Sequence, residues 1–368
     1  MTTEYGRAPA DKEVEVTILG PGFGESIVIH IGSNRWIIID SCTDESGEPA
    51  ALTYLSDIGV DPQAVELVVA THWHDDHVSG LSKIVDACSQ ARFCTSTILE
   101  KAEFLQLIYS FDKSYNPSLN SSGTSEFAST LEILRKTKRK IVRAASDKRL
   151  VLIESGLAHN LPLEIWALSP SDYSLERFFK RIGSELPKEK ETKYRAPSIT
   201  DNETAVVILV RIGNESILLG ADLEEAHGGW SAILESTGRP TTKSKIFKIP
   251  HHGSQNAHHD GVWNGMLSEK PLGLLTPYNR GKRLPNLRDV DRICKITDSA
   301  FSTQKLRKLS QVPRDQVIKK LIETTVSGLV QLKREVGVIR ARFEPNDIEQ
   351  TLAVEQFKGA CHLSEVHS

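Results

Sequence analysis

The chain has 368 residues, of which 39% are hydrophobic and 25% are charged. This composition is ordinary for a globular protein and disfavours disordered, collagen-like and repeat classes. Its 45 Lys and Arg residues against 48 Asp and Glu give a formal net charge of −3, which offers no overall attraction to a phosphate backbone. Any binding of nucleic acid must therefore be local.

The cysteines and the apolar segments bear on the compartment. The five cysteines are scattered and form no CxxC pair, which disfavours both a disulfide framework and a thiolate zinc cluster. No stretch approaches the roughly eighteen apolar residues of a membrane span, and the first residues lack the apolar part of a signal peptide. We therefore expect a cytoplasmic protein without a membrane-embedded part.

The first elements in chain order are short strands. Strands are predicted over 13–19, 25–31 and 35–40, divided by the turns GPGFGE and GSN, and together they indicate an antiparallel meander. A helix over 50–58 and an apolar strand over 65–71 follow, and this strand runs directly into the letters HWHDDH. These histidines thus occupy a strand-to-helix loop, where open sheets place their functional sites.

The remaining elements alternate in type. Residues 99–147 are helix-rich around a polar loop at 111–126, which is either a lid over a site or a surface connection. The basic run from Arg135 to Arg143 in this region has a solvated helix face as its favoured interpretation. The later predicted elements are strands over 150–154, 163–168, 205–212, 216–219, 245–249, 272–276, 328–332 and 336–343, and helices over 229–237 and 314–325.

These elements predict an α+β protein, an αββα four-layer sandwich. We expect a catalytic domain over 1–300, with a helical and loop insertion at 99–147. Residues 301–368 form a C-terminal extension, expected to pack on the same domain.

The HWHDDH loop has the residue types and spacing of a metal site. His72 and His74 are separated by one residue on an extended segment, so their side chains point the same way and can bind one cation. Asp76 and His77 can then bind a second cation. Chance would produce HxHxDH in roughly one sequence in a thousand of this length. Imidazole and carboxylate ligands suit zinc, manganese, iron or cobalt, and two such ions form a hydrolytic pair.

The segment THWHDDHVSGL resembles the signature loop of the metallo-β-lactamase superfamily. The preceding GPGFGESIVIHIGSNRWIIIDS resembles the family's opening meander, which implies that Asp40 supports a metal-binding histidine through a hydrogen bond. LLGADLEE resembles the motif of a metal-bridging aspartate, which falls on Asp222. Taken alone, Asp222 would more readily be a helix cap, and Asp40 the start of a turn.

KIFKIPHHGS resembles an element of the branch that includes the hydrolase domain of bacterial DNA-uptake (competence) proteins and the phosphorylcholine esterases. The choice of ligand between its two histidines is open, and we favour His251 as the ligand. His252 would then be free to give a proton to the leaving group. Lys248 and Ser254 would help to hold a phosphate, with a surface lysine and a loop serine as the alternatives.

The sequence departs from the hydrolytic lactamases and glyoxalases in lacking their isolated histidine between the first loop and the bridging aspartate. DNET stands there instead and resembles a segment of the competence-protein branch, which implies that Asp201 and Asn202 face the metals. The related branch also carries a His-Pro pair where this chain has Leu284 and Pro285. Arg280, Lys282 and Arg283 beside it either supply positive charge or form a solvated turn.

The resemblance implies a metal-dependent hydrolase that binds two divalent transition-metal ions, with zinc favoured and manganese as the alternative. A hydroxide bridging the two ions would attack the substrate. Asp76 and His252 are the residues expected to take part in catalysis, and a phosphodiester, including nucleic acid, is the expected substrate. The alternatives are a hydrolase of small esters, lactones or amides, and an effector or regulatory subunit activated by a protein partner. A homo-oligomer stays open.

Overall fold

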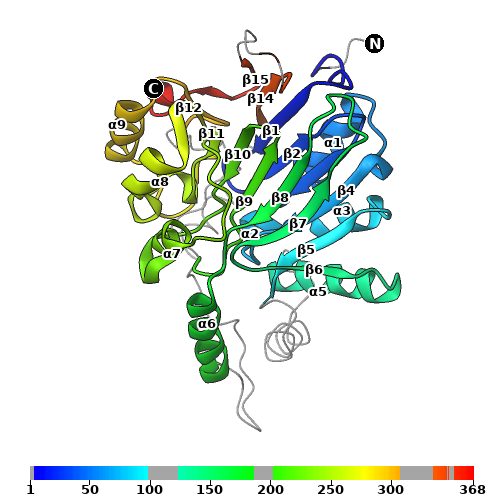
Figure 1. Ribbon diagram of the computed structural model, residues 1–368. Helices are drawn as coiled ribbons and strands as arrows, with labels where there is room; N and C mark the ends of the chain where they lie inside the picture. Colours follow the sequence, from blue (N-terminus) through cyan, green and yellow to red (C-terminus); the bar gives the residue numbers. More distant parts are fainter. Residues whose placement is uncertain (1–3, 98–122, 186–201, 307–334, 346, 348–351) are drawn as a thin grey trace, which may run out of the picture.

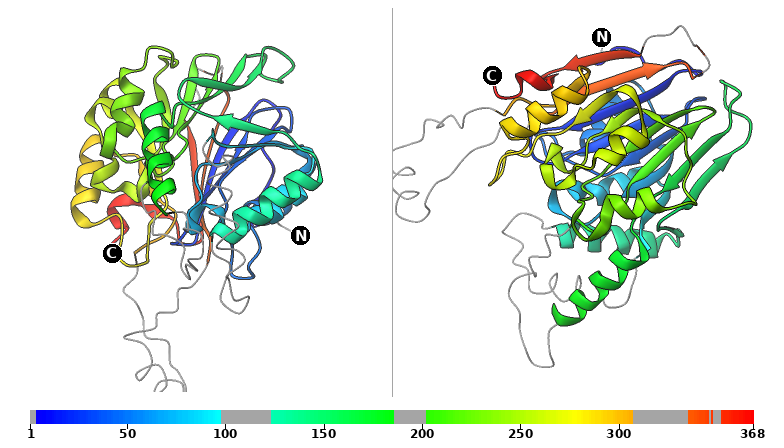
Figure 2. Two further views of the ribbon diagram at one scale, coloured as in Figure 1. Left: turned by 90° about the horizontal axis from the view of Figure 1, so that it is seen from below. Right: turned by 60° about the vertical axis from the view of Figure 1, so that its left-hand side comes forward.

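The computed structural model describes the chain except for residues 1–3, 98–122, 186–201, 307–334, 346 and 348–351. Within the described part, two eight-stranded sheets face each other (Figure 1). Seen from below in Figure 2, helices lie on the outer side of each sheet, in the order helix, sheet, sheet, helix. The predicted αββα four-layer sandwich is confirmed.

The first sheet has the strand order β15-β14-β1-β2-β3-β4-β5-β6. Its strands are β1 (Val14–Gly20), β2 (Ser26–His30), β3 (Trp36–Ile39), β4 (Val65–Ala70), β5 (Arg92–Ser96), β6 (Ile141–Ala144), β14 (Gly337–Phe343) and β15 (Ala353–Phe357). The predicted antiparallel meander is confirmed in β1, β2 and β3. From β3 to β6 the pairing is parallel. The carboxyl ends of β3 and β4 therefore share one edge, where Asp40 and His72 follow.

The second sheet has the order β16-β13-β12-β11-β10-β9-β8-β7. Its strands are β7 (Lys148–Ile153), β8 (Leu163–Ala167), β9 (Ile208–Ile212), β10 (Glu215–Leu219), β11 (Ser244–Lys248), β12 (Leu267–Leu275), β13 (Ala300–Ser302) and β16 (Cys361–His362). β9 and β10 pair as an antiparallel hairpin within the strands predicted over 205–212 and 216–219, whereas β10, β11 and β12 run parallel. Parallel strands bring the segments after β10, β11 and β12 to one edge, and these segments carry Asp222, the two adjacent histidines and Thr276.

The helices seal the outer faces of the sheets. Their bounds are α1 (Ala50–Asp57), α2 (Asp75–Val78), α3 (Leu81–Ala87), α5 (Gly123–Lys136), α6 (Asp172–Glu185), α7 (Gly229–Glu235), α8 (Asp260–Gly265) and α9 (Leu287–Ile296). Tyr54 of α1 and Phe127 of α5 belong to the core outside the first sheet, and Trp230 of α7 to the core outside the second. A third apolar core fills the space between the sheets. Burial of these side chains is the main driving force for the sandwich.

Two segments differ in structure from the sequence-based prediction. The described part of 99–147 supplies α5 and β6 to the sandwich, so the insertion is narrower than predicted. Residues 337–343 form β14, which pairs with β1 over its whole length and buries its residues. The described part of 301–368 is thus built into both sheets. The helix expected over 314–325, the strand over 328–332 and most of the polar loop at 111–126 lie outside the described residues.

The basic run at 135–143 has partly structural roles. Arg139 donates hydrogen bonds to the carbonyls of Val85 (2.6 Å) and Cys88 (3.0 Å) at the carboxyl end of α3, where a cation is favourable. Lys136 pairs with Glu132 one turn earlier on α5. None of the helices in the described part of the chain has the length and apolar character needed to cross a membrane.

Candidate metal centre

The predicted site residues meet at the shared edge of the two sheets, on loops that hold a strained backbone. Asp40, Ala221, His251 and His252 have φ angles of 58°, 45°, 47° and 54°. Residues other than glycine rarely adopt this left-handed region, and such strain is typical of functional sites. Gly24 (φ 99°) lies at the same edge, and a Cβ there would approach the Asp76 carbonyl oxygen to 3.0 Å.

Three histidines each present the same nitrogen to the interior of the site. Within the described part of the chain, the Nε2 atoms of His72, His77 and His252 are buried without a hydrogen-bond partner. A buried polar atom without a hydrogen-bond partner costs folding free energy, so these nitrogens are candidates to bind a ligand. An imidazole whose Nδ1 is bonded and whose Nε2 is open is arranged as a metal ligand.

The Nδ1 atoms of these imidazoles are held from behind. The His77 Nδ1–H donates to Asp40 Oδ2 (2.8 Å), and the His252 Nδ1–H donates to the Thr276 carbonyl (2.9 Å). Thr71 donates its hydroxyl proton to Asp40 (2.7 Å) and lies 2.9 Å from the His72 Nδ1. The structure therefore places Asp40 behind the ring of His77, which is a predicted metal ligand.

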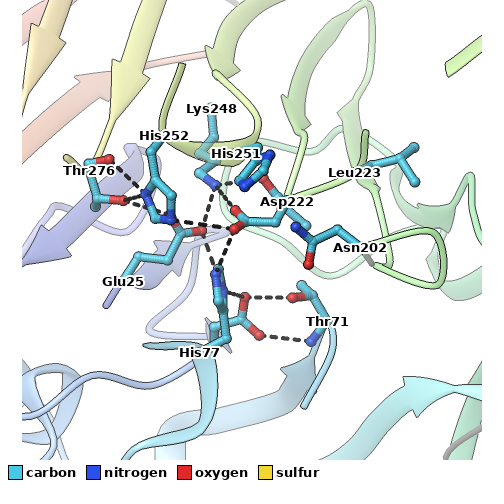
Figure 3. A network of polar contacts seen from close by, with 12 residues as sticks. Glu25, Thr71, His77, Asn202, Asp222, Leu223, Lys248, His251, His252 and Thr276 are labelled. Atoms are coloured by element: carbon cyan, nitrogen blue, oxygen red, sulfur yellow. Dashed lines mark hydrogen bonds and ion pairs between the residues drawn. The ribbon is translucent and has the colours of Figure 1, made fainter. Parts of the chain in front are cut away.

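Four ligand atoms converge in one group. Asp76, His77, Asp222 and His252 each offer an atom, and all four atoms lie within 4.8 Å of one another. The Asp222 Oδ2 lies 3.3 Å from the His77 Nε2 and 3.4 Å from the His252 Nε2, and Figure 3 shows both rings directed at this carboxylate. Asp76 and His77 come from the edge of the first sheet, whereas Asp222 and His252 come from the edge of the second sheet.

His72 and His74 lie beside this group. The ring centroids of His72 and His74 are 4.7 Å apart, and those of His72 and His77 are 4.1 Å apart. Burial lowers the pKa of His72 well below its usual range, and the neighbouring His77 and His74 lower it further. His72 is therefore neutral, the form in which an imidazole binds a cation.

The carboxylates of the centre stabilise positive charge on the groups beside them. Burial alone lowers the pKa of His252, but Asp222 and Asp76 outweigh it and raise this pKa to about 10. The pKa of His77 is likewise raised well above its usual range, because Asp222, Asp76 and Asp40 outweigh burial. Burial raises the pKa of Asp222, yet His252, His77 and Lys248 lower it overall, well below its usual range. Cations bound here would take over the charge that these protons carry.

The sequence-based choice between the adjacent histidines is wrong in this geometry. His251 lies outside the four-residue group, and its Nδ1 bonds the Asn256 side chain (3.0 Å) and faces Glu224 (3.3 Å). His252 instead turns its ring into the site, where Nδ1 is held by the Thr276 carbonyl and Nε2 faces Asp222. His252 is therefore the ligand candidate, and His251 lies on the cleft wall.

Lys248 does not face a substrate, which corrects its predicted role as a phosphate ligand. Its side chain is 1% exposed and ion-pairs with Glu25 (2.7 Å) and Asp222 (3.4 Å). It also donates to the Ala221 carbonyl (2.7 Å). Lys248 thus holds the Asp222 Oδ1 and leaves Oδ2 for the metal group (Figure 3).

Glu25, Thr71 and Thr276 are the functional residues that sequence reasoning missed. Glu25 is buried and accepts a hydrogen bond from the Thr276 hydroxyl (2.8 Å) while it pairs with Lys248. Thr71 directly precedes His72, and Thr276 directly follows β12. The only available signal was their place at strand ends beside predicted ligands.

The DNET segment lies partly within the described residues. Asp201 lies outside them, whereas Asn202 lines the cleft with a buried Oδ1 that has no hydrogen-bond partner there. Its Nδ2 donates to Glu224 (3.1 Å). Ser254 also lines the cleft. His159 bonds the Ile31 carbonyl (3.1 Å), so it does not supply the missing ligand.

The cleft over the ligands has a volume of about 620 Å³. Its walls include Phe23, Trp73 and Tyr278 together with the cations Arg280 and Lys282. Arg283, the third cation of the predicted loop, lines a neighbouring hollow instead. The site therefore combines a carboxylate and imidazole floor with a positively charged wall.

Imidazoles whose buried Nε2 atoms have no hydrogen-bond partner in the described part of the chain, together with buried carboxylates, fit divalent metal ions. Asp76, His77, Asp222 and His252 would hold one ion. His72 and His74, which lie beside this group, could hold a further ion.

The first third of the chain matches a known family. Residues 19–135 match the family model described as the metallo-beta-lactamase superfamily. The curated proteins give no match to this chain.

Several solved structures are similar at low identity. The metallo-beta-lactamase fold protein YhfI from Bacillus subtilis is 14% identical over 78% of this chain and 94% of that chain, with a TM-score of 0.38. The MIM-2 metallo-beta-lactamase is 13% identical over 71% of this chain and 80% of that chain, with a TM-score of 0.35. A Cronobacter sakazakii metallo-beta-lactamase with a HARLDQ motif is 14% identical over 58% of this chain, with a TM-score of 0.33; the match spans 61% of that protein, less than two thirds of it.

The matched segment contains the end of β1, the strands β2 and β3 and the HWHDDH loop, and the two facing sheets with outer helices form the metallo-β-lactamase fold. Over residues 19–135 this chain is therefore similar to the metallo-β-lactamase superfamily.

Proposed function

We propose that this chain is a two-metal hydrolase of phosphodiesters. The observation that carries the proposal is that Arg280 and Lys282 line the same cleft as Asp76, Asp222 and His252. A phosphodiester carries a negative charge, so a cationic wall beside the metal ligands suits it better than it suits a neutral ester or lactone. The resemblance of PHHGS and DNET to the competence-protein branch supports the same substrate class.

When bound, the two ions would supply Lewis acidity and lower the pKa of a water molecule enough for attack at neutral pH. The chain's own residues arrange the centre. Asp40 and Thr276 fix the rings of His77 and His252, and Lys248 fixes the carboxylate of Asp222. Arg280 and Lys282 would bind the non-bridging oxygens of the substrate and orient it for in-line attack.

His251 takes over the role first expected of His252. It lines the cleft, lies outside the four-residue ligand group, and is held by Asn256. An imidazole in this position can donate a proton to the leaving oxygen, which is the usual task of a general acid. Alkyl leaving groups need such a proton, whereas nitrophenolate leaves without one.

A turnover panel tests the function. The metal-loaded protein is assayed with bis(p-nitrophenyl) phosphate, single-stranded and double-stranded nucleic acid, nitrocefin, an acyl lactone and p-nitrophenyl acetate. We expect turnover of the phosphodiesters above all others. Hydrolysis of the lactone or acetate without any phosphodiesterase activity would instead favour the small-ester hydrolase.

The double variant Arg280→Gln/Lys282→Gln tests the cationic wall. Hydrogen bonds to charged groups contribute roughly 1.5–3 kcal/mol, so KM for bis(p-nitrophenyl) phosphate should rise at least about tenfold. KM for the neutral p-nitrophenyl acetate serves as the internal control. Equal changes in KM for both substrates would contradict a role of these two positive charges in binding the phosphodiester.

A further inference from the structure

The segment that follows β12 is strongly basic. Residues 277–288, PYNRGKRLPNLR, contain Arg280, Lys282, Arg283 and Arg288 and no acidic residue, although the whole chain has a net charge of −3. These four cations are here called the basic tract. Asp289, the next residue, is buried and pairs with Arg292 at 2.7 Å, so it does not neutralise them.

The basic tract continues beyond the metal cleft. Arg280 and Lys282 line the cleft itself. Arg283 and Arg288 line an adjoining open hollow of about 550 Å³, together with Leu287 and His367. Since Arg283 and Leu284 are consecutive and line different hollows, the loop forms the ridge between the two. Positive charge therefore extends from the reaction centre across this ridge.

The loop is held in place from several sides. Tyr278 and Leu284 exchange backbone hydrogen bonds of 2.8 and 3.0 Å, and the Asn279 N–H donates to the Gly22 carbonyl (2.8 Å). The Arg280 guanidinium lies over the Phe23 ring, 3.3 Å from its centroid. The His367 imidazole bonds the Pro285 carbonyl (3.0 Å). A loop anchored in this way presents its cations without a large ordering cost on binding.

We propose that the basic tract binds a polynucleotide strand on one side of the scissile phosphodiester, so that the natural substrate is a nucleic acid. This inference rests on the proposed function, because the phosphodiester at the metals sets the position of the next phosphates. Arg280 and Arg288 are eight positions apart, which sets an upper limit of about 29 Å on the length of the tract at 3.3–3.6 Å per residue. A tract of up to this length can contact a few successive nucleotides.

The role of the tract is tested by binding of a labelled twelve-residue oligothymidylate to the protein in the presence of a metal chelator, which prevents cleavage. Each phosphate contact contributes about 0.7 to the slope of log K against log salt for a single strand. The Arg283→Gln/Arg288→Gln variant should therefore lose about 1.4 of slope, which is roughly a 20-fold loss of affinity at 0.1 M salt. Arg283→Lys/Arg288→Lys should retain the slope, because it retains the charge.

A matched control removes two exposed cations elsewhere. Lys12→Gln/Lys148→Gln makes the same change in net charge and should bind like the unaltered protein. Melting temperatures of all variants verify folding. Identical affinity and slope for the Gln variant and the unaltered protein would overturn the proposal. Polyglutamate of equal charge binding as tightly as the oligonucleotide would also overturn it, in favour of an acidic protein partner.

The proposed function and the tract can fail separately. Turnover of bis(p-nitrophenyl) phosphate without an effect of the Gln variant on oligonucleotide binding overturns the tract alone. Oligonucleotide binding that depends on Arg283 and Arg288, without turnover of any phosphodiester, overturns the proposed function and leaves the tract as a nucleic-acid-binding surface.

Discussion

The two adjacent histidines each have a bonded Nδ1, and they differ in where the remaining part of the ring lies. His252 has its Nδ1 bonded to the Thr276 carbonyl and its Nε2 open toward Asp222. His251 has its Nδ1 bonded to Asn256 and lies on the cleft wall. The ligand candidate and the proposed proton donor are thus distinguished by where their rings lie rather than by their order in the sequence.

Substitution of each histidine tests this division. His252→Ala should lose about one metal equivalent, because the four-ligand group loses a member. His251→Ala should keep its metals but hydrolyse alkyl phosphodiesters more than about tenfold more slowly, whereas nitrophenyl esters should be affected less. Elemental analysis and paired kinetics measure both effects. Metal loss in the His251 variant alone would restore the original choice.

Asp222→Ala should lower metal content and reduce phosphodiester turnover by more than about 100-fold, since loss of a mere supporting residue already costs 10–100-fold. The variant should still fold, because Lys248 retains Glu25 and the Ala221 carbonyl as partners. Metal analysis and far-ultraviolet circular dichroism provide the measurements. Normal metal content with full turnover would leave Asp222 as a helix cap.

The sequence could predict which residues are candidate ligands, because HxHxDH and the later Asp and His-His motifs are local patterns. It could not predict that Lys248 is buried against Glu25, since this ion pair joins the loop before β2 to the end of β11. The sequence also could not predict the orientation of the His251 and His252 rings, because this orientation depends on two left-handed backbone conformations.

At the scale of the elements, the strands before the metal loops were predictable from their apolar runs and bounding glycines. The role of β14 was not, because its pairing with β1 joins residues more than 300 positions apart. Val338, Ile339, Ala341 and Phe343 of β14 are all buried. The carboxyl-terminal part of the chain is therefore needed for the first sheet, although the sequence predicted it to be an extension.

A chain that ends at residue 300 should fail to fold, because β1 would lose one of its two partner strands and the core would lose the side chains of β14. Soluble yield and circular dichroism measure the outcome. A folded, metal-binding fragment of this length would show that the domain boundary at 300 is real.

A full-length variant makes the same test without truncation. Phe343→Ala should lower the free energy of unfolding by about 3–5 kcal/mol, the usual cost of removing a buried phenylalanine ring. Leu152→Ala, at a side chain that is 41% exposed, is the control and should change it by no more than about 0.5 kcal/mol. Urea denaturation measures both, and equal effects would contradict the role of β14.

At the scale of the whole molecule, the two sheets form the metal centre only together. His72, His74, Asp76 and His77 follow β4 of the first sheet, whereas Asp222 and His252 follow β10 and β11 of the second. Sequence order alone could not show that these edges coincide. The fold class could be predicted, because alternating strands and helices with buried strand ends allow few other arrangements.

Metal analysis of the mildly purified protein tests the central claim most directly. The unaltered protein should carry close to two transition-metal equivalents, and His72→Ala/His74→Ala should keep about one, because Asp76, His77, Asp222 and His252 remain together. Metal content that is the same in the unaltered protein and in this double variant would contradict a two-metal centre at these residues.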